Sequence, residues 1–569
     1  MKQKITLIVF IIAILIVSIL KQMLVYDLPI CANVELNIDD MLMINIVDNI
    51  VNENWLGKYD DVILSKGLSF PLILVLCYYV HIDYITMMTA LYTFACLYLI
   101  LVLSKRIKNK IILFFIYLLT LFTPIMYSYQ VMQRVYRNAI IPSLVIFIIA
   151  GYLNLFFTRN DGISKKRFIT SIGIGIIFAV FWRTREDSIW ILPYVFFISI
   201  VLLISILIKN KKITKEFFMT LLILIVPFVI TFAYTNVLSY INYKNYGVYT
   251  VYNNEQYNKA IKSLKKVKKY DYYDNIDFTT AKLKKVSEVT VLSNIYKSLE
   301  GLVYGYSLFD SSLLEGEVVN GWFPWALRGA LNQNGYYENA KETNNFYYTL
   351  HVQIEEALKN GTLEKEDVKP DISSLLKDIF CEVGNVFTAL FEYYDIEFHT
   401  DKVEYNSFYE YKYEMYAKYT NNKFYIYNTE TGEDIYYQEN MENYEENITP
   451  KINIIKQLME IYKVVSTSLF IIGCVLYLVL SIIVIVNLFK KKFENLEIWI
   501  MSSGILGAML SLIFGIAYET AFNANVITAM YLSAVYPLMI IFGSVLIGCF
   551  IIKAIGIINK KTEDRKKTN

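Results

Sequence analysis

The sequence predicts a mainly α-helical, polytopic membrane protein with about ten spans and one half-span. It also predicts an extracytoplasmic, mostly helical domain that carries a small β element. Hydrophobic residues make up 56% of the 569 positions, and the mean hydropathy is +0.40, above the range of soluble proteins. Apolar stretches long enough to span a bilayer as helices recur along the chain. One long polar insert separates an N-terminal group of these stretches from a C-terminal group.

The apolar stretches that we expect to cross the bilayer stand on both sides of the insert. They are 5–24, 84–104, 111–127, 138–157, 168–182, 188–208 and 216–238 before it, and 464–489, 496–518 and 530–557 after it. The apolar segment 69–80 is only about 18 Å long as a helix, which predicts a half-span. The chain therefore divides into three parts. Residues 1–239 are an N-terminal transmembrane module with an outer acidic loop at 25–68, residues 240–462 are the extracytoplasmic domain, and residues 463–569 are C-terminal helices with a basic tail.

Lysine-rich short loops predict the side of the membrane on which each loop lies, because cytoplasmic loops collect Lys and Arg. The basic clusters that we expect on the cytoplasmic face are 105–110, 165–167, 209–215, 490–492 and the tail after Lys560. Both termini are expected on this face. The other face receives the acidic loop, the 128–137 and 183–187 loops and the insert. This arrangement predicts a multi-pass cell-membrane protein, and the formal net charge of +2 gives no indication of nucleic acid as a partner.

The insert is too rich in aromatic residues to be disordered, which predicts a folded domain. The stretch TNNFYYTLHVQIEEALKNG has helical periodicity and ends at Gly361. The segment KFYIYNTETGEDIYY alternates aromatic and polar residues around a glycine-containing turn, which predicts a β-hairpin. Cys31 and Cys381 are expected outside the membrane, where they either form a disulfide or remain two free thiols.

Two adjacent carboxylates, Asp39 and Asp40, stand at the head of an apolar stripe in NIDDMLMINIVDN. Met43, Ile46 and Val47 repeat at helical spacing, so we expect an amphipathic helix lying flat on the outer membrane surface. A structural interpretation makes one Asp the N-cap of this helix. A functional interpretation makes the pair a base for sugar transfer from a lipid carrier. The same pair could also hold a divalent cation, Mg²⁺ or Mn²⁺, against a phosphate.

Arginines gather in the outer loops, where the sidedness rule disfavours cations. The sequences YSYQVMQRVYRN and FWRTREDSIW contribute Arg134, Arg137, Arg183 and Arg185. Because a guanidinium binds phosphate in a bidentate manner, these side chains are predicted phosphate ligands. Lys66, in LSKGLSFP, adds another outer cation. The structural alternative pairs Arg183 and Arg185 with Glu186 and Asp187 and leaves Lys66 as a solvated loop residue.

Three more outer residues are candidate substrate contacts, together with Glu186. Trp322 and Arg328 lie in GEVVNGWFPWALRGALNQNGYY, and aromatic faces are common platforms for sugar rings. Tryptophan near a membrane also anchors at the interface, and core packing is the ordinary role of helical aromatics. Glu519, in the outer turn AYETAFNANVITAMY, is either part of the same cavity or part of a plain helix connection.

The order of these parts resembles the GT-C superfamily of integral membrane glycosyltransferases. The resemblance rests on a first span, an outer loop that opens with DDMLM, and then YDDVILSKGLSFPLILVL leading into the next apolar segment. RVYRNAIIPSL and WRTREDSIWILP add to it, so that it covers roughly residues 1–240. It implies inverting transfer of a sugar from a polyprenyl phosphate to a glycan, lipid or protein acceptor. Asp39 or Asp40 would match the acidic loop that supplies the base or metal ligand in the superfamily.

Two other function classes stay open. A transporter or flippase for a lipid-linked saccharide would use the arginines to bind headgroups without needing a base. It predicts polar residues deep in several spans, and these are scarce in the apolar stretches. A noncatalytic scaffold or sensor would present the insert to cell-wall partners and bind no polyprenyl phosphate.

Overall fold

The computed structural model of the chain describes most of its residues. They are 2–35, 37–162, 164–252, 255–270, 276–308, 316–366, 372–399, 403–404, 406–422, 424–428, 433–436 and 444–568. Within them the chain is mostly helical. Eight of the described helical segments are long and apolar enough to cross a membrane. The predicted class, a helical polytopic membrane protein, is therefore confirmed.

The helices before the insert follow the predicted spans closely. They are α1 (Lys2–Val25), α2 (Asp40–Val51), α3 (Ser69–Val80), α4 (Tyr84–Leu103), α5 (Lys110–Leu121), α6 (Ile141–Phe157), α7 (Lys165–Trp182), α8 (Leu192–Asn210) and α9 (Lys215–Tyr246). The C-terminal helices are α17 (Tyr444–Phe489), which begins within the predicted insert, α18 (Leu496–Phe522), α19 (Ala529–Leu532) and α20 (Val535–Thr568). The short α3 coincides with the expected half-span, which its length explains.

Three predicted spans differ from the helices that the structure places there; the last of them, 530–557, is divided into α19 and α20. α5 ends at Leu121, and Pro124 begins a separate 3₁₀ helix, because a proline disfavours helical backbone at the residue before it. With 12 residues, α5 is about 18 Å long. α7 begins with two lysines and Arg167, so its 18 residues include too many charges for a full apolar span. Neither α5 nor α7 is among the eight candidate spans.

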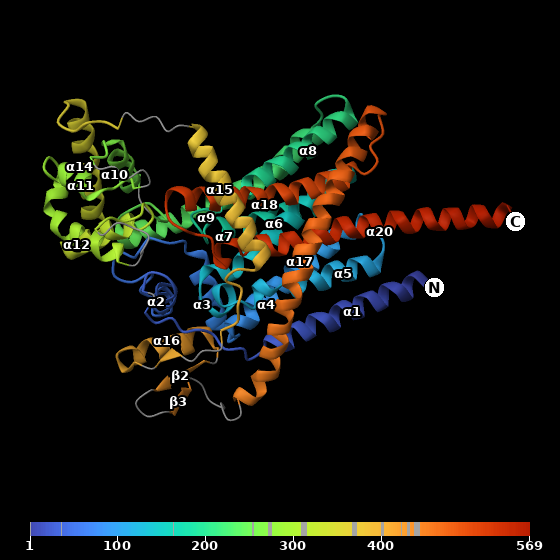
Figure 1. The fold of residues 1–569 in the computed structure, drawn as a ribbon, viewed down its shortest axis with the longest axis horizontal. Helices are drawn as coiled ribbons and strands as arrows, with labels where there is room; N and C mark the ends of the chain where they lie inside the picture. Colours follow the sequence, from blue (N-terminus) through green and yellow to red (C-terminus); the bar gives the residue numbers. More distant parts are fainter. Residues whose placement is uncertain are drawn as a thin grey trace.

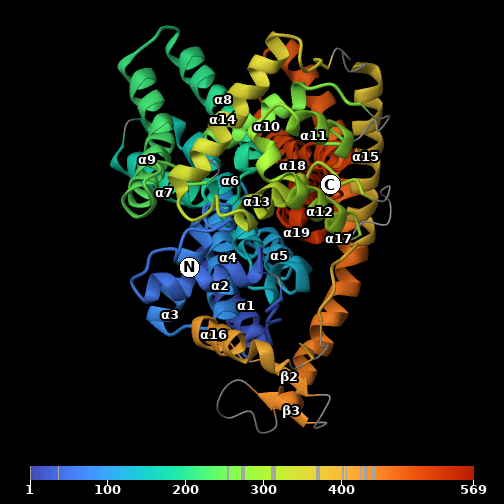
Figure 2. The same ribbon diagram turned by 90° about the vertical axis from the view of Figure 1, so that its left-hand side faces the viewer.

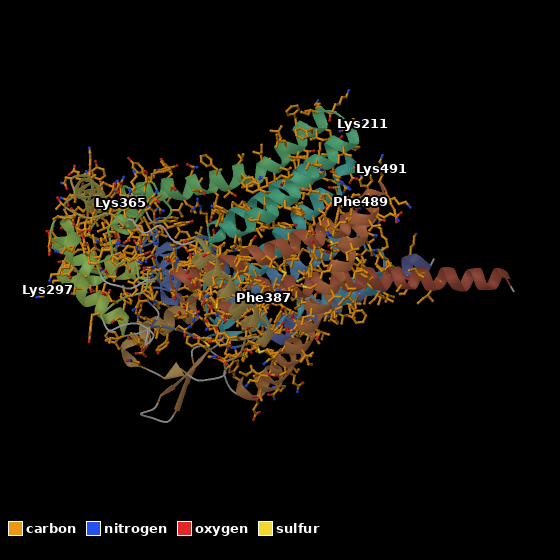
Figure 3. All side chains as sticks on the ribbon, turned by 45° about the horizontal axis from the view of Figure 1, so that its top comes forward. Lys211, Lys297, Lys365, Phe387, Phe489 and Lys491 are labelled. Carbon is orange, nitrogen blue, oxygen red and sulfur yellow. The ribbon has the colours of Figure 1, made fainter. Side chains whose placement is uncertain are left out.

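The helices lie side by side as a bundle, in which α7 packs on α9, α4 on α6, and α17 on α20. One continuous apolar core runs through this bundle. Figure 1 shows both chain ends at one end of the molecule, and α10, α11, α12 and α14 at the opposite end. Lys211 and Lys491, from two of the predicted basic loops, lie at the end that carries the chain ends, while Lys297 and Lys365 of the insert lie at the other (Figure 3).

The first part of the insert forms a helical unit with its own apolar core. Its helices are α10 (Glu255–Lys266), α11 (Thr280–Ser287), α12 (Tyr296–Ser307), α13 (Phe323–Gln333) and α14 (Ala340–Lys359). Leu299, Leu327 and Leu350 are fully buried in this core. The predicted end of the α14 stretch is confirmed, because Gly361 follows the helix with a left-handed φ of +79°.

The second part of the insert joins the core of the transmembrane bundle instead. The helix α15 (Ile372–Glu392) packs along α18, and the ring centroids of Phe380 and Phe514 are 5.8 Å apart. The helix α16 (Glu410–Thr420) packs on α2 and α3. Figure 1 and Figure 2 both place α16 and the strands β2 and β3 at the opposite edge of the molecule from α8.

The described strands are short. β1 (Val403–Glu404) pairs in parallel with β2 (Tyr425–Asn428), and β2 pairs antiparallel with β3 (Glu433–Tyr436). The turn predicted between the last two strands lies outside the described residues. Cys31 is buried, Cys381 is exposed, and no disulfide joins them, as one of the two alternatives predicted.

The helix predicted after the acidic pair is present as α2, but its surroundings differ from the prediction. Met43, Ile46 and Val47 are buried inside the protein, since α3 and α16 cover that face. The expectation that this apolar stripe lies on the membrane surface is therefore wrong. The sequence could not reveal this, because α16 is contributed by residues far along the chain.

Candidate functional site

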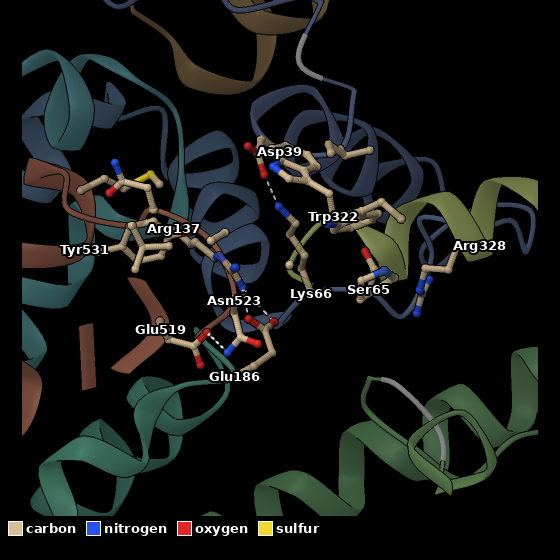
Figure 4. Close-up of a pocket in the computed structure, with 18 of the residues that line it drawn as sticks. Asp39, Ser65, Lys66, Arg137, Glu186, Trp322, Arg328, Glu519, Asn523 and Tyr531 are labelled. Carbon is tan, nitrogen blue, oxygen red and sulfur yellow. Dashed lines mark hydrogen bonds and ion pairs between the residues drawn. The ribbon is translucent and has the colours of Figure 1, made fainter. Parts of the chain in front are cut away.

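A pocket of about 440 Å³ lies where the insert meets loops and helix ends of the bundle. Its walls come from the start of α2, the loop before α3, the segments before α6 and α8, α13, and the α18–α19 connection. Seven of the eleven predicted site residues line it: Asp39, Lys66, Arg137, Glu186, Trp322, Arg328 and Glu519. Figure 4 shows these side chains, drawn from distant parts of the sequence, around one cavity.

The pocket lies at the ends of the candidate spans. Arg137 begins the candidate span that ends at Phe157, and Glu186 lies two residues before the span Ser188–Asn210. Glu519 lies in the last turn of the span Leu496–Phe522. Spans of this kind cross the hydrocarbon core, so the cavity sits beside its edge, where lipid headgroups would be.

Asp39 faces the pocket and is held by three neighbouring groups. Its Oδ1 atom forms an ion pair with Lys66 Nζ and accepts a hydrogen bond from the Tyr136 hydroxyl at 3.0 Å. Its Oδ2 atom lies 3.7 Å from Arg134. Burial alone would raise the pKa of this carboxyl, but Lys66, Arg134 and Tyr136 outweigh it and hold the pKa below its ordinary value. Asp39 is therefore ionised near neutral pH.

The structural interpretation, in which one Asp caps this helix with its side chain, does not hold for Asp39. The residue occupies the N-cap position of α2, but its side chain accepts no hydrogen bond from the backbone of that helix. The carboxylate instead turns toward Lys66 and Tyr136. A charged neighbour competes well against a neutral backbone N–H, because charge-assisted hydrogen bonds are the stronger kind.

Asp40 lies behind Asp39 and does not line the pocket. It is 0% exposed, and Arg134 holds both of its oxygens, with Nε–Oδ distances of 3.1 and 3.2 Å. Asn33 donates to it at 3.1 Å. Burial outweighs the guanidinium and raises the pKa of Asp40 above its ordinary value. Of the two predicted catalytic acids, only Asp39 can reach a ligand in the pocket.

The loop that carries Lys66 is fixed against the loop after α7. The backbone N–H of Gly67 donates to Glu186 Oε1 at 3.0 Å, and that of Ser69 donates to the Arg183 carbonyl at 3.2 Å. A Cβ atom at Gly67 would lie 2.7 Å from the Thr184 carbonyl oxygen. Only glycine allows the two backbones to approach this closely, so Gly67 sets the position of Lys66.

Arg137 and Glu186 form an ion pair on the neighbouring wall. Arg137 NH1 lies 2.8 and 2.7 Å from the two carboxylate oxygens of Glu186. Arg137 Nε also donates to the Tyr136 hydroxyl at 3.1 Å. Lys66 Nζ donates to the same hydroxyl at 2.8 Å. Lys66 and Arg137 thus share one tyrosine, and each also has one carboxylate partner.

The two arginines after α7 do not line the pocket. Arg185 pairs with Asp187, donates to Asn138 at 2.7 Å, and lies 4.6 Å from the centre of the Tyr531 ring. This pairing agrees with the structural alternative. Arg183 pairs with neither Glu186 nor Asp187 and instead donates to Thr235 at 2.8 Å. The network predicted for Arg183 is wrong because Glu186 is taken by Arg137 and Gly67.

The helix α13 forms the wall contributed by the insert. Trp322, which is 37% exposed, stacks on Tyr306 with ring centroids 5.5 Å apart. The Trp325 ring lies 5.6 Å from Lys66 Nζ. Arg328 is buried and donates to the Asp61 carbonyl, which ties α13 to the loop before α3. This wall offers aromatic surface beside a cation.

The α18–α19 connection closes the remaining side. Glu519 is exposed and accepts a hydrogen bond from Asn523 at 2.7 Å. The backbone N–H of Gly321 donates to the Asn523 carbonyl at 3.1 Å, and Asn320 donates to the Phe522 carbonyl at 2.7 Å. These bonds dock the insert onto the C-terminal helices and so complete the pocket.

The acidic pair does not provide the ligands that a divalent cation prefers. Mg²⁺ and Mn²⁺ favour sets of carboxylate and carbonyl oxygens. Lys66 and Tyr136 occupy Asp39, while Arg134 and Asn33 occupy Asp40. Among the described residues, no group of three or more His, Cys, Asp or Glu side chains lies together. A cation at Asp39 would have to displace an ammonium group that is already there.

Two tyrosines of the pocket were not predicted from the sequence. Tyr136 stands between two predicted arginines in RVYRN, and Tyr531 also lines the cavity. Tyrosine is abundant in this chain, at 48 residues, so residue type alone carries no signal. The position of Tyr136 between Arg134 and Arg137 is the feature of the sequence from which it could have been predicted.

Comparisons with protein-family models, with curated proteins and with solved structures found no match to this chain.

Proposed function

We propose that the chain is a membrane glycosyltransferase of the GT-C type. It would move one sugar from a polyprenyl-phosphate donor to an acceptor hydroxyl of a cell-wall or surface glycan, a glycolipid or a protein. The observation that carries this proposal is the convergence of Asp39, Lys66, Arg137 and Trp322 on one pocket beside the ends of the candidate spans. A carboxylate base, phosphate-binding cations and an aromatic surface are the groups that such a transfer needs.

The donor would bind with its phosphate at the cationic wall and its sugar against the tryptophans. Lys66 and Arg137 both line the pocket, and Lys66 lies beside Trp325. A phosphate would compete with Asp39 and Glu186 for these cations, so binding would loosen the two ion pairs. The prenyl chain would remain in the bilayer, because the cavity lies beside the ends of the spans.

The acceptor would approach from the side of Glu519 and Asn523. Its hydroxyl oxygen would attack the anomeric carbon of the donor sugar while its proton passes to Asp39. The bond between the anomeric carbon and the phosphate oxygen would break, with the electron pair staying on the phosphate. Attack opposite the leaving group gives inversion at that carbon. Lys66 and Arg137 would offset the charge that develops on the phosphate, and no step runs through a metal ion.

The orientation in the membrane is part of the same proposal. The end of the molecule that carries Lys211 and Lys491 (Figure 3) would face the cytoplasm together with both termini, in keeping with the excess of lysine in the loops there. The pocket and the insert would face outward, where lipid-linked sugars present their reactive carbon. For both termini and the basic loops to share one face, α5 with the 3₁₀ helix that follows it and α7 would have to cross in addition to the eight candidate spans, with α3 as a half-span.

A transfer assay with the full-length chain in lipid nanodiscs tests the proposal. Radiolabelled polyprenyl-phosphate hexoses and pentoses serve as donors, and cell-envelope glycan and glycolipid fractions serve as acceptors. We expect the label to pass from the lipid to an acceptor with at least one donor. Asp39→Asn should reduce the rate by at least about 100-fold, the usual contribution of a general base.

The matched control is Asp161→Asn, because Asp161 is exposed in the loop between α6 and α7. This control should transfer at the rate of the unmodified chain. Equal rates for Asp39→Asn and the control, at equal expression, would remove Asp39 from the mechanism. Donor binding without transfer would favour a transporter, and no binding of any labelled lipid would favour a scaffold.

A further inference from the structure

The hydroxyl of Tyr136 lies at the centre of the charged groups of the pocket. It is within 3.0 Å of Asp39 Oδ1, 2.8 Å of Lys66 Nζ and 3.1 Å of Arg137 Nε. Lys66 and Arg137 can only donate hydrogen bonds, and a phenol has a single proton to donate. The proton of Tyr136 must therefore point at Asp39, while its oxygen accepts from both cations.

The two oxygens of Asp39 are engaged unequally. Oδ1 receives the Tyr136 hydroxyl and the Lys66 ammonium. Oδ2 lies 3.7 Å from Arg134 NH2, which is bound to Asp40. A carboxylate oxygen has about two lone-pair sites. Oδ2 consequently keeps acceptor capacity that Oδ1 has already used.

We propose that Tyr136 is a positioning residue for the base: it holds Asp39 through Oδ1, so that Oδ2 is the atom that takes the acceptor proton. This inference rests on the proposed glycosyl transfer. When the donor phosphate draws Lys66 away from Asp39, Tyr136 remains as the neutral donor that keeps the carboxylate in place. The proton moves from the acceptor hydroxyl to Oδ2, and the electron pair of the broken sugar–phosphate bond stays on the phosphate.

Tyr136 has the rigidity that such a role requires. Its side chain is buried, at 3% exposure, and the charged groups of Lys66 and Arg137 lie 5.1 and 5.4 Å from the centre of its ring. The backbone before Arg137 is extended, and a 3₁₀ helix (Arg137–Ile140) then leads directly into α6. The phenol is therefore fixed by a regular element and not by a free loop.

The charged and titratable groups that face Asp39 set the sign of the expected pH effect. They are Lys66, Arg134, Tyr136, the neighbouring Asp40, and Tyr531 across the pocket. The hydrogen bond from Tyr136 lowers the pKa of Asp39. Removing it raises that pKa, so the base becomes protonated at a higher pH. The acid limb of the pH–rate profile should then move to higher pH.

The test measures kcat and the donor KM of Tyr136→Phe as a function of pH with labelled polyprenyl-phosphate sugar. We expect kcat to fall about tenfold, because one hydrogen bond to a charged group is lost. The donor KM should change less than about twofold, since Lys66 and Arg137 remain. The pH at the midpoint of the acid limb should increase by roughly half a unit or more.

Tyr92→Phe is the matched control. Tyr92 is a buried phenol that donates to the Thr120 carbonyl at 2.8 Å in the bundle, away from the pocket. The Tyr92→Phe variant should lose about as much stability as Tyr136→Phe and keep the original kcat and pH profile. A second variant, Tyr136→3-fluorotyrosine, keeps the shape of the side chain and strengthens its hydrogen bond, so its acid limb should move to lower pH.

Two outcomes separate this inference from the function on which it rests. If Asp39→Asn abolishes transfer while both Tyr136 variants keep the original kcat and pH limb, the positioning role is overturned and the glycosyltransferase stands. If the unmodified chain transfers no sugar from any donor, both proposals fall. An acid limb that moves to higher pH in Tyr136→Phe and to lower pH in the 3-fluorotyrosine variant supports the inference.

Discussion

The backbone of Gly67 lies directly against the carbonyl oxygen of Arg183, so that a Cβ atom added at Gly67 would overlap that oxygen. Two loops that are far apart in the sequence therefore meet through a glycine. One carries Lys66, and the other carries Glu186. The geometry of the proposed phosphate site depends on this contact.

Gly67→Ala should separate the two loops and move Lys66 away from Asp39. We expect transfer to fall at least about tenfold, because misplaced binding groups lose rate steeply. The melting temperature should fall by only a few degrees, since the helices of the bundle are not involved. Gly507→Ala is the matched control, because a Cβ atom there meets nothing within 4 Å. Equal losses in the two variants would contradict a special role for Gly67.

Asn320→Ala should weaken the docking of the insert onto the C-terminal helices. Its side chain accepts from the Asp277 backbone at 2.7 Å and donates to the Phe522 carbonyl at 2.7 Å. We expect a loss of about 2 kcal/mol in the free energy of unfolding, because buried partners are left unsatisfied. Thermal unfolding of the purified chain measures this loss. An unchanged melting temperature would show that the docking does not depend on these bonds.

Lys21 gives a prediction about stability inside the bundle. Its side chain is fully buried, and among the described residues its amino group has no hydrogen-bond partner. It lies 3.4 Å from the centre of the Tyr127 ring. Lys21→Met keeps the length of the side chain and removes the polar atom, so we expect the melting temperature to stay equal or to rise.

Lys21→Gln is the comparison for that variant. It retains a polar group without a partner and should lower the melting temperature relative to Lys21→Met. The opposite order would mean that a polar group at this position finds a partner in the folded bundle. Both variants should keep transfer activity, because Lys21 lies outside the pocket.

The charge of Asp39 predicts how stability depends on pH. Lys66 and Arg134 hold the pKa of Asp39 in the folded protein below its ordinary value of 3.8. Its contribution is therefore complete above pH 3.8 and is lost as the pH falls through the lower folded-state value. Asp39→Asn should be less stable than the unmodified chain near neutral pH, and this difference should shrink on acidification.

Thermal unfolding in detergent from about pH 7 down to pH 3 measures the convergence of the two curves. The fully buried control is Asp40→Asn, whose pKa is shifted upward. The difference in stability between Asp40→Asn and the unmodified chain should change over a higher pH range than the difference for Asp39→Asn. A constant gap between Asp39→Asn and the unmodified chain at every pH would show that the Asp39 carboxylate is not stabilised by its cations.

The helices were largely predictable from the sequence because apolar length determines them. α3 occupies the predicted residues 69–80, and each predicted span falls on a helix. The early end of α5 depends on Pro124, a local feature that was present in the sequence but not used. The burial of the apolar face of α2 could not be predicted, because the covering helix α16 comes from the distant insert.

Part of the candidate site was predictable, because cations in loops where the sidedness rule disfavours them indicate a binding role. Lys66, Arg137 and Glu186 were recognised as charged groups in outer loops, and the structure brings them to one cavity. Their partners were not predictable. The contact between Lys66 and Asp39 joins residues on either side of α2, and the choice of Arg137 over Arg183 as the partner of Glu186 depends on tertiary packing.

The measurement that most directly tests the account is equilibrium binding of a labelled polyprenyl-phosphate sugar to the full-length chain in nanodiscs, with and without Lys66→Met. The account predicts saturable binding that unlabelled polyprenyl phosphate displaces and that Lys66→Met weakens at least about tenfold, since one charge-assisted contact to the phosphate is lost. Saturable binding of equal affinity in Lys66→Met, or no saturable binding at all, would contradict it.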